Sequence, residues 1–221
     1  MIFIIGGTGI LGAELKKIDD SLICIGSEYD IFTFSALRQK LGECNPDIVV
    51  NLCASKTTED PIKSINVNII GSSNISKYCI ENSKRLVYIS TDYVYPGTDG
   101  NYKETDSLLP FNDYAWTKLG GESSTRLVEN HLIIRTSFGE STFKYDAAWD
   151  NQIVSKDYVD VIAPKILTAI KSNLTGILNI GTEPKTMYEY ATKRNTVGKK
   201  SLTKSLNFSL NNERYKNSLD N

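Results

Sequence analysis

The sequence contains one histidine, only four cysteines and no cluster of metal-ligating residues. His131 directly precedes an apolar stretch, so we assign it a structural role and no catalytic one. The cysteines, Cys24, Cys44, Cys53 and Cys79, show no C-x-x-C spacing. We therefore expect neither a metal site nor a disulfide framework, and we interpret the cysteines as small core residues in a reducing compartment.

Charge and hydropathy exclude two further classes of partner. The 221 residues include 25 basic and 26 acidic side chains, so no basic excess attracts nucleic acid or an anionic membrane surface. No apolar run approaches the roughly 20 residues that a membrane span needs. Residues 1–5 lack the charged start of a signal peptide, so we expect a cytoplasmic protein.

Short apolar runs alternate with helical patterns along most of the chain. These runs are continuous, which is typical of strands buried on both faces of a parallel sheet. We expect strands at 2–5, 22–26, 47–52, 86–90, 132–135 and 177–181, and helices at 10–19, 34–44, 61–81, 113–129 and 160–172. The repeated strand–helix–strand order predicts an α/β fold with a doubly wound (Rossmann) parallel sheet.

Prolines mark the starts of two expected helices. Asp60 followed by Pro61 is typical of an N-cap and a first helical residue. Pro164 fits the helix at 160–172 if Asp160 is its N-cap, because the proline then falls in the first turn, where N–H groups have no intrahelical partner.

A glycine-rich segment follows the first expected strand. Residues 6–12 read Gly-Gly-Thr-Gly-Ile-Leu-Gly and open the first expected helix. In such a loop Gly6 permits a tight turn, Gly9 lets the backbone approach a pyrophosphate, and Gly12 lets the helix pack close to the strand. The helix N-terminus then offers free N–H groups to phosphates. This context favours dinucleotide binding over a purely structural turn.

The residues after the second expected strand leave the choice of dinucleotide open. Glu28 at the strand end favours NAD, because an acidic residue there holds the adenosine ribose. If Glu28 points away, the small Ser27 leaves room for the 2′-phosphate of NADP, although no arginine follows to bind it.

Tyr114 and Lys118 stand four residues apart on one expected helix face. A lysine ammonium one turn away favours the phenolate, so we expect it to lower the tyrosine pKa from its usual value of roughly 10. Tyr114 could then donate a proton to a carbonyl oxygen as hydride reaches its carbon.

Hydroxyl groups gather where the fourth expected strand ends, at Ser90 and Thr91. Ligands of doubly wound sheets bind at the carboxyl ends of strands. We expect Thr91 or Ser90 to hydrogen-bond the substrate carbonyl.

These motifs together resemble the extended short-chain dehydrogenases/reductases, and among them the dTDP-4-dehydrorhamnose reductase family. The resemblance covers residues 2–137. It rests on the glycine loop, Asp30-Ile31, Asn51-Leu-Cys53-Ala54-Ser55, Val67-Asn68-x-x-Gly71, the run from Ser90 to Gly97, Tyr114-Ala-Trp-Thr-Lys118 and Arg135-Thr136-Ser137.

The resemblance implies roles for individual residues. It implies the catalytic residues Thr91, Tyr114 and Lys118. Cofactor contacts would come from Gly6, Thr8, Gly9, Ile10, Leu11, Gly12, Asp30, Ile31, Cys53, Ala54, Ser55, Ser90, Tyr114 and Lys118. Substrate contacts would come from Thr91, Asp92, Tyr93, Val94 and Tyr114. The implied reaction is NADPH-dependent reduction of a 4-keto group on a nucleotide-linked deoxysugar, with NAD as the alternative cofactor, and a homodimer is possible.

The sequence departs from the family pattern after Arg135, where it is shorter. We divide the chain into a dinucleotide-binding Rossmann domain (1–137), a reduced substrate-binding portion with the last strand–helix unit (138–192) and a polar arm rich in Lys, Asn and Ser (193–221). Two alternatives stay open: a nucleotide-sugar epimerase, and a regulatory or cofactor-binding protein of the same fold. Dehydration is disfavoured, because Thr91 is followed by Asp92 and Tyr93 rather than by Asp and Glu.

Overall fold

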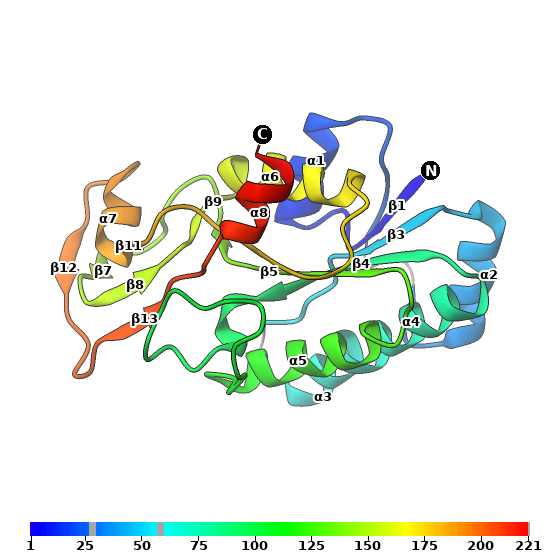
Figure 1. Ribbon diagram of the computed structural model, residues 1–221, viewed down its shortest axis with the longest axis horizontal. Helices are drawn as coiled ribbons and strands as arrows, with labels where there is room; N and C mark the ends of the chain where they lie inside the picture. The colour runs from blue at the N-terminus through cyan, green and yellow to red at the C-terminus, as the bar shows by residue number, and fades with distance from the viewer. Residues whose placement is uncertain (27–29, 57–59, 221) are drawn as a thin grey trace.

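A six-stranded parallel sheet forms the centre of the computed structural model, which describes residues 1–26, 30–56 and 60–220 (Figure 1). Its strand order is β10-β5-β4-β3-β1-β2, and every pairing is parallel. The strands are β1 (Ile2–Ile5), β2 (Ile23–Ile25), β3 (Ile48–Asn51), β4 (Arg85–Thr91), β5 (His131–Thr136) and β10 (Gly176–Ile180). The doubly wound parallel sheet predicted from the sequence is confirmed.

Helices cover both faces of this sheet, as Figure 1 shows. One face carries α1 (Ile10–Ile18), α6 (Val159–Lys171) and α8 (Glu213–Leu219). The other carries α2 (Phe34–Cys44), α4 (Ser72–Glu81) and α5 (Asp113–Thr125), with α3 (Pro61–Ser64) beside them. Successive strand residues point to opposite faces. In β1, for example, Ile4 packs toward α1 and α6 while Phe3 and Ile5 pack toward α2 and α4.

The expected helix at 61–81 forms with an irregular middle. Asp60 is its N-cap, since its Oδ1 accepts a 2.9 Å hydrogen bond from Lys63 N, and Pro61 is the first helical residue. Between α3 and α4 the backbone adopts a π-helix, η1 (Ile65–Gly71). Such π segments often accompany functional sites.

The start of α6 differs from the prediction. Its N-cap is Tyr158, so Asp160 lies within the first turn and Pro164 lies inside the helix. The carboxylate of Asp160 instead binds the Arg194 guanidinium at 2.7 and 3.0 Å. This ion pair joins two segments that are distant in the sequence. A capping rule considers only neighbouring residues, so it could not predict that Asp160 pairs with Arg194 instead of capping the helix.

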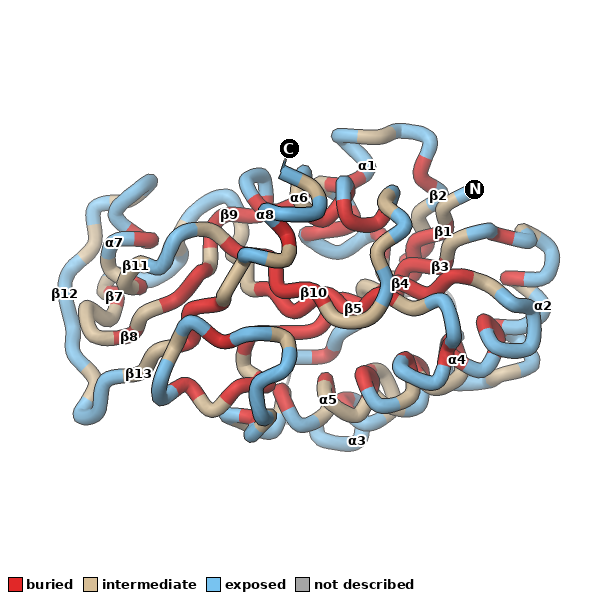
Figure 2. Tube along the Cα trace, in the orientation of Figure 1, coloured by how far each residue is buried: buried red, intermediate tan, exposed pale blue. Residues whose placement is uncertain are grey.

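A smaller lobe follows β5. It contains β6 (Phe138–Gly139), β7 (Ala147–Trp149), β8 (Gln152–Val154), β9 (Asp157–Tyr158), β11 (Lys185–Thr186), α7 (Met187–Thr192), β12 (Gly198–Lys200) and β13 (Leu206–Phe208). These short strands form a three-stranded sheet, β11-β8-β13, and the pairs β12-β7 and β6-β9. Figure 2 shows that buried residues run along the central strands, whereas the outer edge of the lobe at β12 is exposed.

The segment from Lys193 onward, which we expected to be a polar arm, returns to the body of the molecule. It pairs through β13 with β8 and ends in α8 beside the sheet (Figure 1). Phe208, Leu210 and Tyr215 are buried along this path. The few apolar residues of the segment are therefore the ones that hold it in place.

Candidate active site

The glycine loop lies at the topological switch point of the sheet, where β1 neighbours both β2 and β3. Gly6 has a φ of +81°, a conformation that side chains rarely adopt, and a Cβ there would lie 2.9 Å from Cys53 N. A Cβ on Gly12 would lie 2.4 Å from Gly7 Cα. The start of α1 therefore packs so close to the loop that only glycine fits at position 12.

The loop offers free backbone donors to an anionic ligand. Thr8, Gly9 and Ile10 are exposed, and the first intrahelical bond of α1 runs from Ala13 N to Gly9 O at 2.9 Å. The N–H groups at residues 10–12 therefore have no intrahelical acceptor, and they stand at the positive end of the helix dipole. This cradle, which side chains would fill, fits the pyrophosphate of a dinucleotide.

The segment after β3 forms the second wall of the crevice. Asn51 Oδ1 accepts from Cys53 N at 3.0 Å, and Asn68 bonds both backbone groups of Ser55 at 2.8 and 2.9 Å. Asn68 Nδ2 also donates to Thr117 Oγ1 at 2.8 Å. Burial raises the pKa of the Cys53 thiol to about 11, which keeps it neutral.

Asn68 is a positioning residue that the sequence interpretation did not include among the site residues. It is fully buried in η1 and joins the segment after β3 to α5. The run Val67-Asn68-x-x-Gly71, on which part of the family resemblance rests, was the sequence signal that could have identified it.

Tyr114 lies in the first turn of α5, which is fixed to the end of β4. Asn112 caps α5 by accepting from Ala115 N at 2.9 Å. Just before it, Phe111 N donates to Tyr93 O at 2.9 Å, in the short 3-10 turn η2 (Asp92–Val94) that follows β4. These contacts hold Tyr114 close to the end of β4.

The predicted lowering of the Tyr114 pKa is wrong for this structure. Burial raises the pKa of Tyr114 above its ordinary value, and the carboxylate of Asp92 raises it further. The Lys118 ammonium does not oppose this shift. It lies 3.5 Å from Cys53 O and 4.1 Å from the Tyr88 ring centroid. Tyr114 is consequently a neutral phenol, which is the form that donates a proton.

Lys118 is only 1% exposed, and burial lowers its pKa to about 7. Its position beside Cys53 O brings the middle of α5 to the segment that follows β3. An ammonium at this point could reach ribose hydroxyls of a dinucleotide held by the glycine loop.

The hydroxyl of Thr91 is engaged in local hydrogen bonds. It donates to Asp92 Oδ1 at 3.1 Å and accepts from Tyr93 N at 3.2 Å. Asp92 is 1% exposed, and burial raises its pKa to about 6. To donate to a substrate carbonyl, Thr91 must therefore release Asp92.

Three buried side-chain oxygens around the ends of β4 and β5 have no hydrogen-bond partner among the described residues. They are Ser90 Oγ, Asp92 Oδ2 and Thr136 Oγ1. Buried polar atoms are usually paired. Thr91 and Thr136 are register partners at the carboxyl ends of the two strands, so these atoms lie at the edge where ligands of doubly wound sheets bind.

Four further residues that we predicted to contact cofactor or substrate make other contacts within the protein. Asp30 is exposed, and its Oδ1 accepts from Phe32 N and Thr33 N at 2.7 and 3.1 Å. Ile31 is buried against Gly71, and Val94 is buried with Tyr95. The Tyr93 ring packs against the Phe208 ring in a tilted arrangement, with 4.7 Å between the ring centroids. Ser27 and Glu28, which bear on the choice of dinucleotide, lie outside the described residues.

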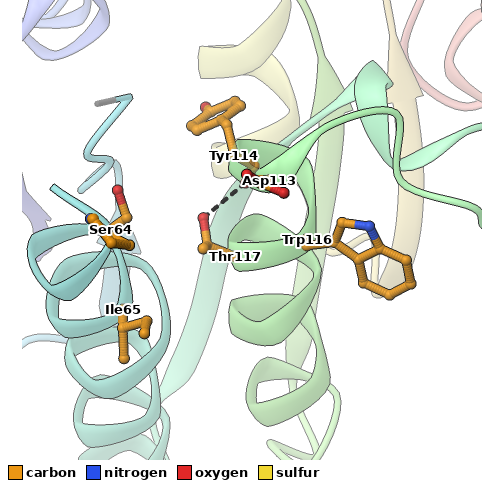
Figure 3. Close-up of a pocket in the computed structure, with 7 residues that line it drawn as sticks. Ser64, Ile65, Asp113, Tyr114, Trp116 and Thr117 are labelled. Atoms are coloured by element: carbon orange, nitrogen blue, oxygen red, sulfur yellow. Dashed lines mark hydrogen bonds between the residues drawn. The ribbon is translucent and has the colours of Figure 1, made fainter. Parts of the chain in front are cut away.

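Two cavities border this region. One, of about 240 Å³, lies between α3 and the first turn of α5, where Ser64 and Ile65 face Thr117 and Tyr114 stands at the helix end (Figure 3). The other, of about 200 Å³, lies between Ile10 of the glycine loop and Phe138 after β5. The structure thus brings together the glycine loop, residues 53–55, the end of β4 and the first turns of α5.

Other features of the chain agree with simple structural roles. His131 Nδ1 lies 2.6 Å from Val128 O, and all four cysteines are free. Over the described residues, none of the helices combines the length and apolar character that crossing a bilayer requires.

Comparison with known proteins gives a family for most of the chain. The RmlD substrate binding domain family matches residues 1–165. The dTDP-4-dehydrorhamnose reductase of Salmonella typhimurium is 33% identical over 156 residues, which make up 62% of this chain and 50% of that protein. The methionine adenosyltransferase 2 subunit beta of Pongo abelii is 28% identical over 148 residues, 59% of this chain and 43% of that protein.

A solved structure shows the same fold. The dTDP-4-dehydrorhamnose reductase of Bacillus anthracis, in complex with NADP, superposes with a TM-score of 0.87 at 22% identity, covering 99% of this chain and 91% of that one. By sequence, the chain spans about half the length of the curated relatives it matches.

Proposed function

The chain belongs to the RmlD substrate binding domain family, as its motifs predicted, and on that premise we propose that it reduces a keto group on a nucleotide-linked deoxysugar with NADPH. The name of the Salmonella typhimurium relative supports both the reaction and the substrate class. The solved relative in complex with NADP supports the cofactor, and NAD stays the alternative because Glu28 lies outside the described residues.

One observation carries the proposal. A neutral Tyr114 phenol, a buried Lys118 and the hydroxyls that end β4 lie on the elements that border the glycine-loop crevice. The crevice fits a dinucleotide because residues 6–12 combine a Cβ-free surface with unpaired N–H groups. When bound there, the cofactor supplies the hydride that reduces the keto carbon.

The protein residues would then handle the carbonyl oxygen. Tyr114 donates its phenolic proton to the oxygen as negative charge develops on it. Thr91 or Ser90 donates a hydrogen bond to the same oxygen. The buried Ser90 hydroxyl has no hydrogen-bond partner among the residues that the structure describes, so it would not have to give up a bond to one of them. Lys118, whose ammonium lies 3.5 Å from Cys53 O, would hydrogen-bond the ribose of the cofactor.

Two titrations test the proposal. Binding of NADPH and NADH is measured by fluorescence, and oxidation is then followed by absorbance after adding a 4-keto-6-deoxy nucleotide sugar. We expect the purified protein to oxidise the cofactor and Tyr114→Phe to lose at least a hundredfold in kcat, with cofactor affinity nearly unchanged. Turnover that survives in Tyr114→Phe would remove this residue as the proton donor.

A second candidate, a cofactor-binding regulatory subunit, is favoured by the similarity to methionine adenosyltransferase 2 subunit beta. It predicts cofactor binding with no oxidation across a panel of keto sugars, a result that would overturn the reductase proposal. An epimerase would interconvert sugar isomers with no net cofactor oxidation, which product analysis by chromatography detects. A homodimer stays a prediction, and sedimentation checks it.

A further inference from the structure

A buried ion pair joins α5 to β5. The Arg135 guanidinium donates two hydrogen bonds to the Glu122 carboxylate, from Nε to Oε1 at 3.1 Å and from Nη2 to Oε2 at 2.8 Å. Both side chains are 1% exposed, and within residues 1–26, 30–56 and 60–220 no other ion pair is as deeply buried on both sides. Because burying two charges costs solvation energy, such a pair adds little net stability. Its two parallel bonds instead fix an orientation.

The same guanidinium holds the loop that follows η2. Its Nη1 donates to Tyr95 Oη at 2.9 Å and to Glu104 O at 3.3 Å. The Tyr95 hydroxyl lies 3.1 Å from Asn179 Oδ1 in β10, and Glu104 Oε1 accepts from Asn179 N at 2.9 Å. Arg135 is therefore fixed by the neighbouring strand and by the loop, so it is a rigid partner for the helix that carries Glu122.

The ion pair lies on the part of α5 that follows the proposed catalytic residues. Glu122 is one helical turn beyond Lys118 and two turns beyond Tyr114, and α5 packs on β4 and β5. A Cβ on Gly121 would lie 2.3 Å from Tyr88 Oη, which itself donates to Lys118 O at 3.1 Å. With the helix this close to β4, a small rotation changes where the side chains of both catalytic residues point. The ion pair fixes that rotation from the β5 side.

The Glu122 carboxylate also acts on the charge of Lys118. Burial lowers the pKa of Lys118 to about 7, the Lys56 ammonium adds to this shift, and the Glu122 carboxylate opposes it. A Cys53 thiolate would oppose it too, but burial raises the pKa of that thiol to about 11, so the thiol is neutral where Lys118 titrates. Glu122 is therefore the negative charge that favours the ammonium form of Lys118 near neutral pH.

We propose that Glu122 and Arg135 are positioning residues for the reaction. Their ion pair fixes the rotation of α5 that directs Tyr114 and Lys118 into the crevice. Glu122 also supplies the negative charge that accompanies Lys118 there. This inference rests on the proposed function and adds to it two residues that act through others. Loss of the pair should therefore slow the reaction without removing a group that touches cofactor or substrate.

The double variant Glu122→Leu with Arg135→Met separates orientation from stability. Apolar side chains of similar size fill the same space, so we expect circular dichroism to give a melting temperature close to that of the unmodified protein. Two hydrogen bonds no longer fix the rotation of α5, so kcat for keto-sugar reduction should fall about tenfold or more, and cofactor affinity should fall with it. Arg126→Met, at the exposed C-cap of α5, is the matched control and should leave all three quantities unchanged.

Glu122→Gln tests the role of the charge, because it keeps the shape of the side chain and leaves the Arg135 cation unbalanced. NMR titration of ¹³C-labelled lysine side chains, with Lys118→Met to assign the signal, measures the titration midpoint of Lys118 directly. We expect Glu122→Gln to lower that midpoint by about half a pH unit or more. The double variant removes both charges, so its midpoint should stay near that of the unmodified protein.

Arg135→Lys tests orientation with both charges kept. A lysine ammonium is a single point charge and cannot form the two parallel bonds to Glu122. We expect kcat to fall while the titration midpoint of Lys118 changes little. This variant also supplies the kinetic comparison if the double variant does not fold.

The positioning proposal and the proposed function fail in different ways. A folded double variant with unchanged kcat and cofactor affinity would overturn the orienting role of the pair, and an unchanged midpoint in Glu122→Gln would overturn the role of its charge. Both results leave the reductase proposal intact. If the unmodified protein neither binds nor oxidises the cofactor, the proposed function fails and the orienting role fails with it. The NMR titration, which needs no cofactor, still decides whether Glu122 acts on Lys118.

Discussion

Replacing Phe208 with alanine should destabilise the protein and weaken the proposed activity together. Phe208 is fully buried in β13. Its ring packs at a tilt against Tyr93, with 4.7 Å between ring centroids, and meets Phe111 edge-on at 5.0 Å. Removing a buried phenylalanine ring costs about 4 kcal/mol, combining lost transfer energy with a cavity. For a domain of this size that lowers Tm by roughly 8–16 °C.

The effect on activity follows from the neighbours of the ring. Tyr93 N donates to the Thr91 hydroxyl, and Phe111 immediately precedes the N-cap of α5. A cavity at Phe208 therefore loosens both sides of the proposed site, and we expect kcat to fall more than cofactor affinity. Thermal melting by circular dichroism and steady-state kinetics below the lowered Tm measure the two effects.

Two control variants test whether the loss of stability comes from the packing of residues 193–220 against the rest of the protein or from mutation in general. Phe208→Leu keeps much of the volume and should cost less than half as much, whereas Lys204→Ala alters an exposed residue of the same segment and should leave Tm unchanged. A Tm for Phe208→Ala within about 2 °C of the unmodified protein, where the structure implies several kcal/mol, would show that residues 193–220 do not pack as described.

Two further variants test the crevice. Gly12→Ala should weaken dinucleotide binding at least tenfold in a fluorescence titration, because its Cβ would lie 2.4 Å from Gly7 Cα and force α1 away from the loop. Lys118→Met should raise the free energy of unfolding at pH 6 by a few kcal/mol while weakening cofactor binding. The pKa of Lys118 is lowered to about 7, so the unfolded chain binds the extra proton between about pH 7 and the ordinary lysine value. The gain should therefore be largest below pH 7 and disappear as pH rises toward 10.5, which urea unfolding at several pH values measures.

The central sheet could be predicted because its strands are buried on both faces. Runs such as Ile2–Ile5 and Ile48–Asn51 are apolar without interruption, and no helical or surface pattern competes with that reading. The glycine loop could be predicted equally well. Gly6 has a positive φ, and a Cβ on Gly7 or Gly12 would lie within 2.5 Å of a neighbouring atom, so a larger residue fits at none of the three positions. The co-location of Tyr114 with the end of β4 then follows from the order of elements in a doubly wound sheet.

The smaller lobe could not be predicted in the same way. Its strands β6 to β9 are two or three residues long, too short for any hydrophobic period to emerge. Phe208 is buried by residues about a hundred positions earlier in the chain, so its local sequence, dominated by Lys, Asn and Ser, indicated exposure.

The direction of the Tyr114 shift bears on the direction of the reaction. Burial and the Asp92 carboxylate raise the pKa of Tyr114, so the phenol keeps its proton throughout the neutral range. Reduction needs that protonated form, whereas oxidation of the alcohol product needs the phenolate as base. The rate of keto-sugar reduction should therefore show no loss from Tyr114 ionisation between pH 6 and about 9, while oxidation of the alcohol product should rise about tenfold per pH unit over the same range. Initial rates in both directions measure this difference. A reduction rate that falls tenfold per pH unit above pH 7, with cofactor binding unchanged, would mean that the phenol ionises near neutrality and that burial does not control it.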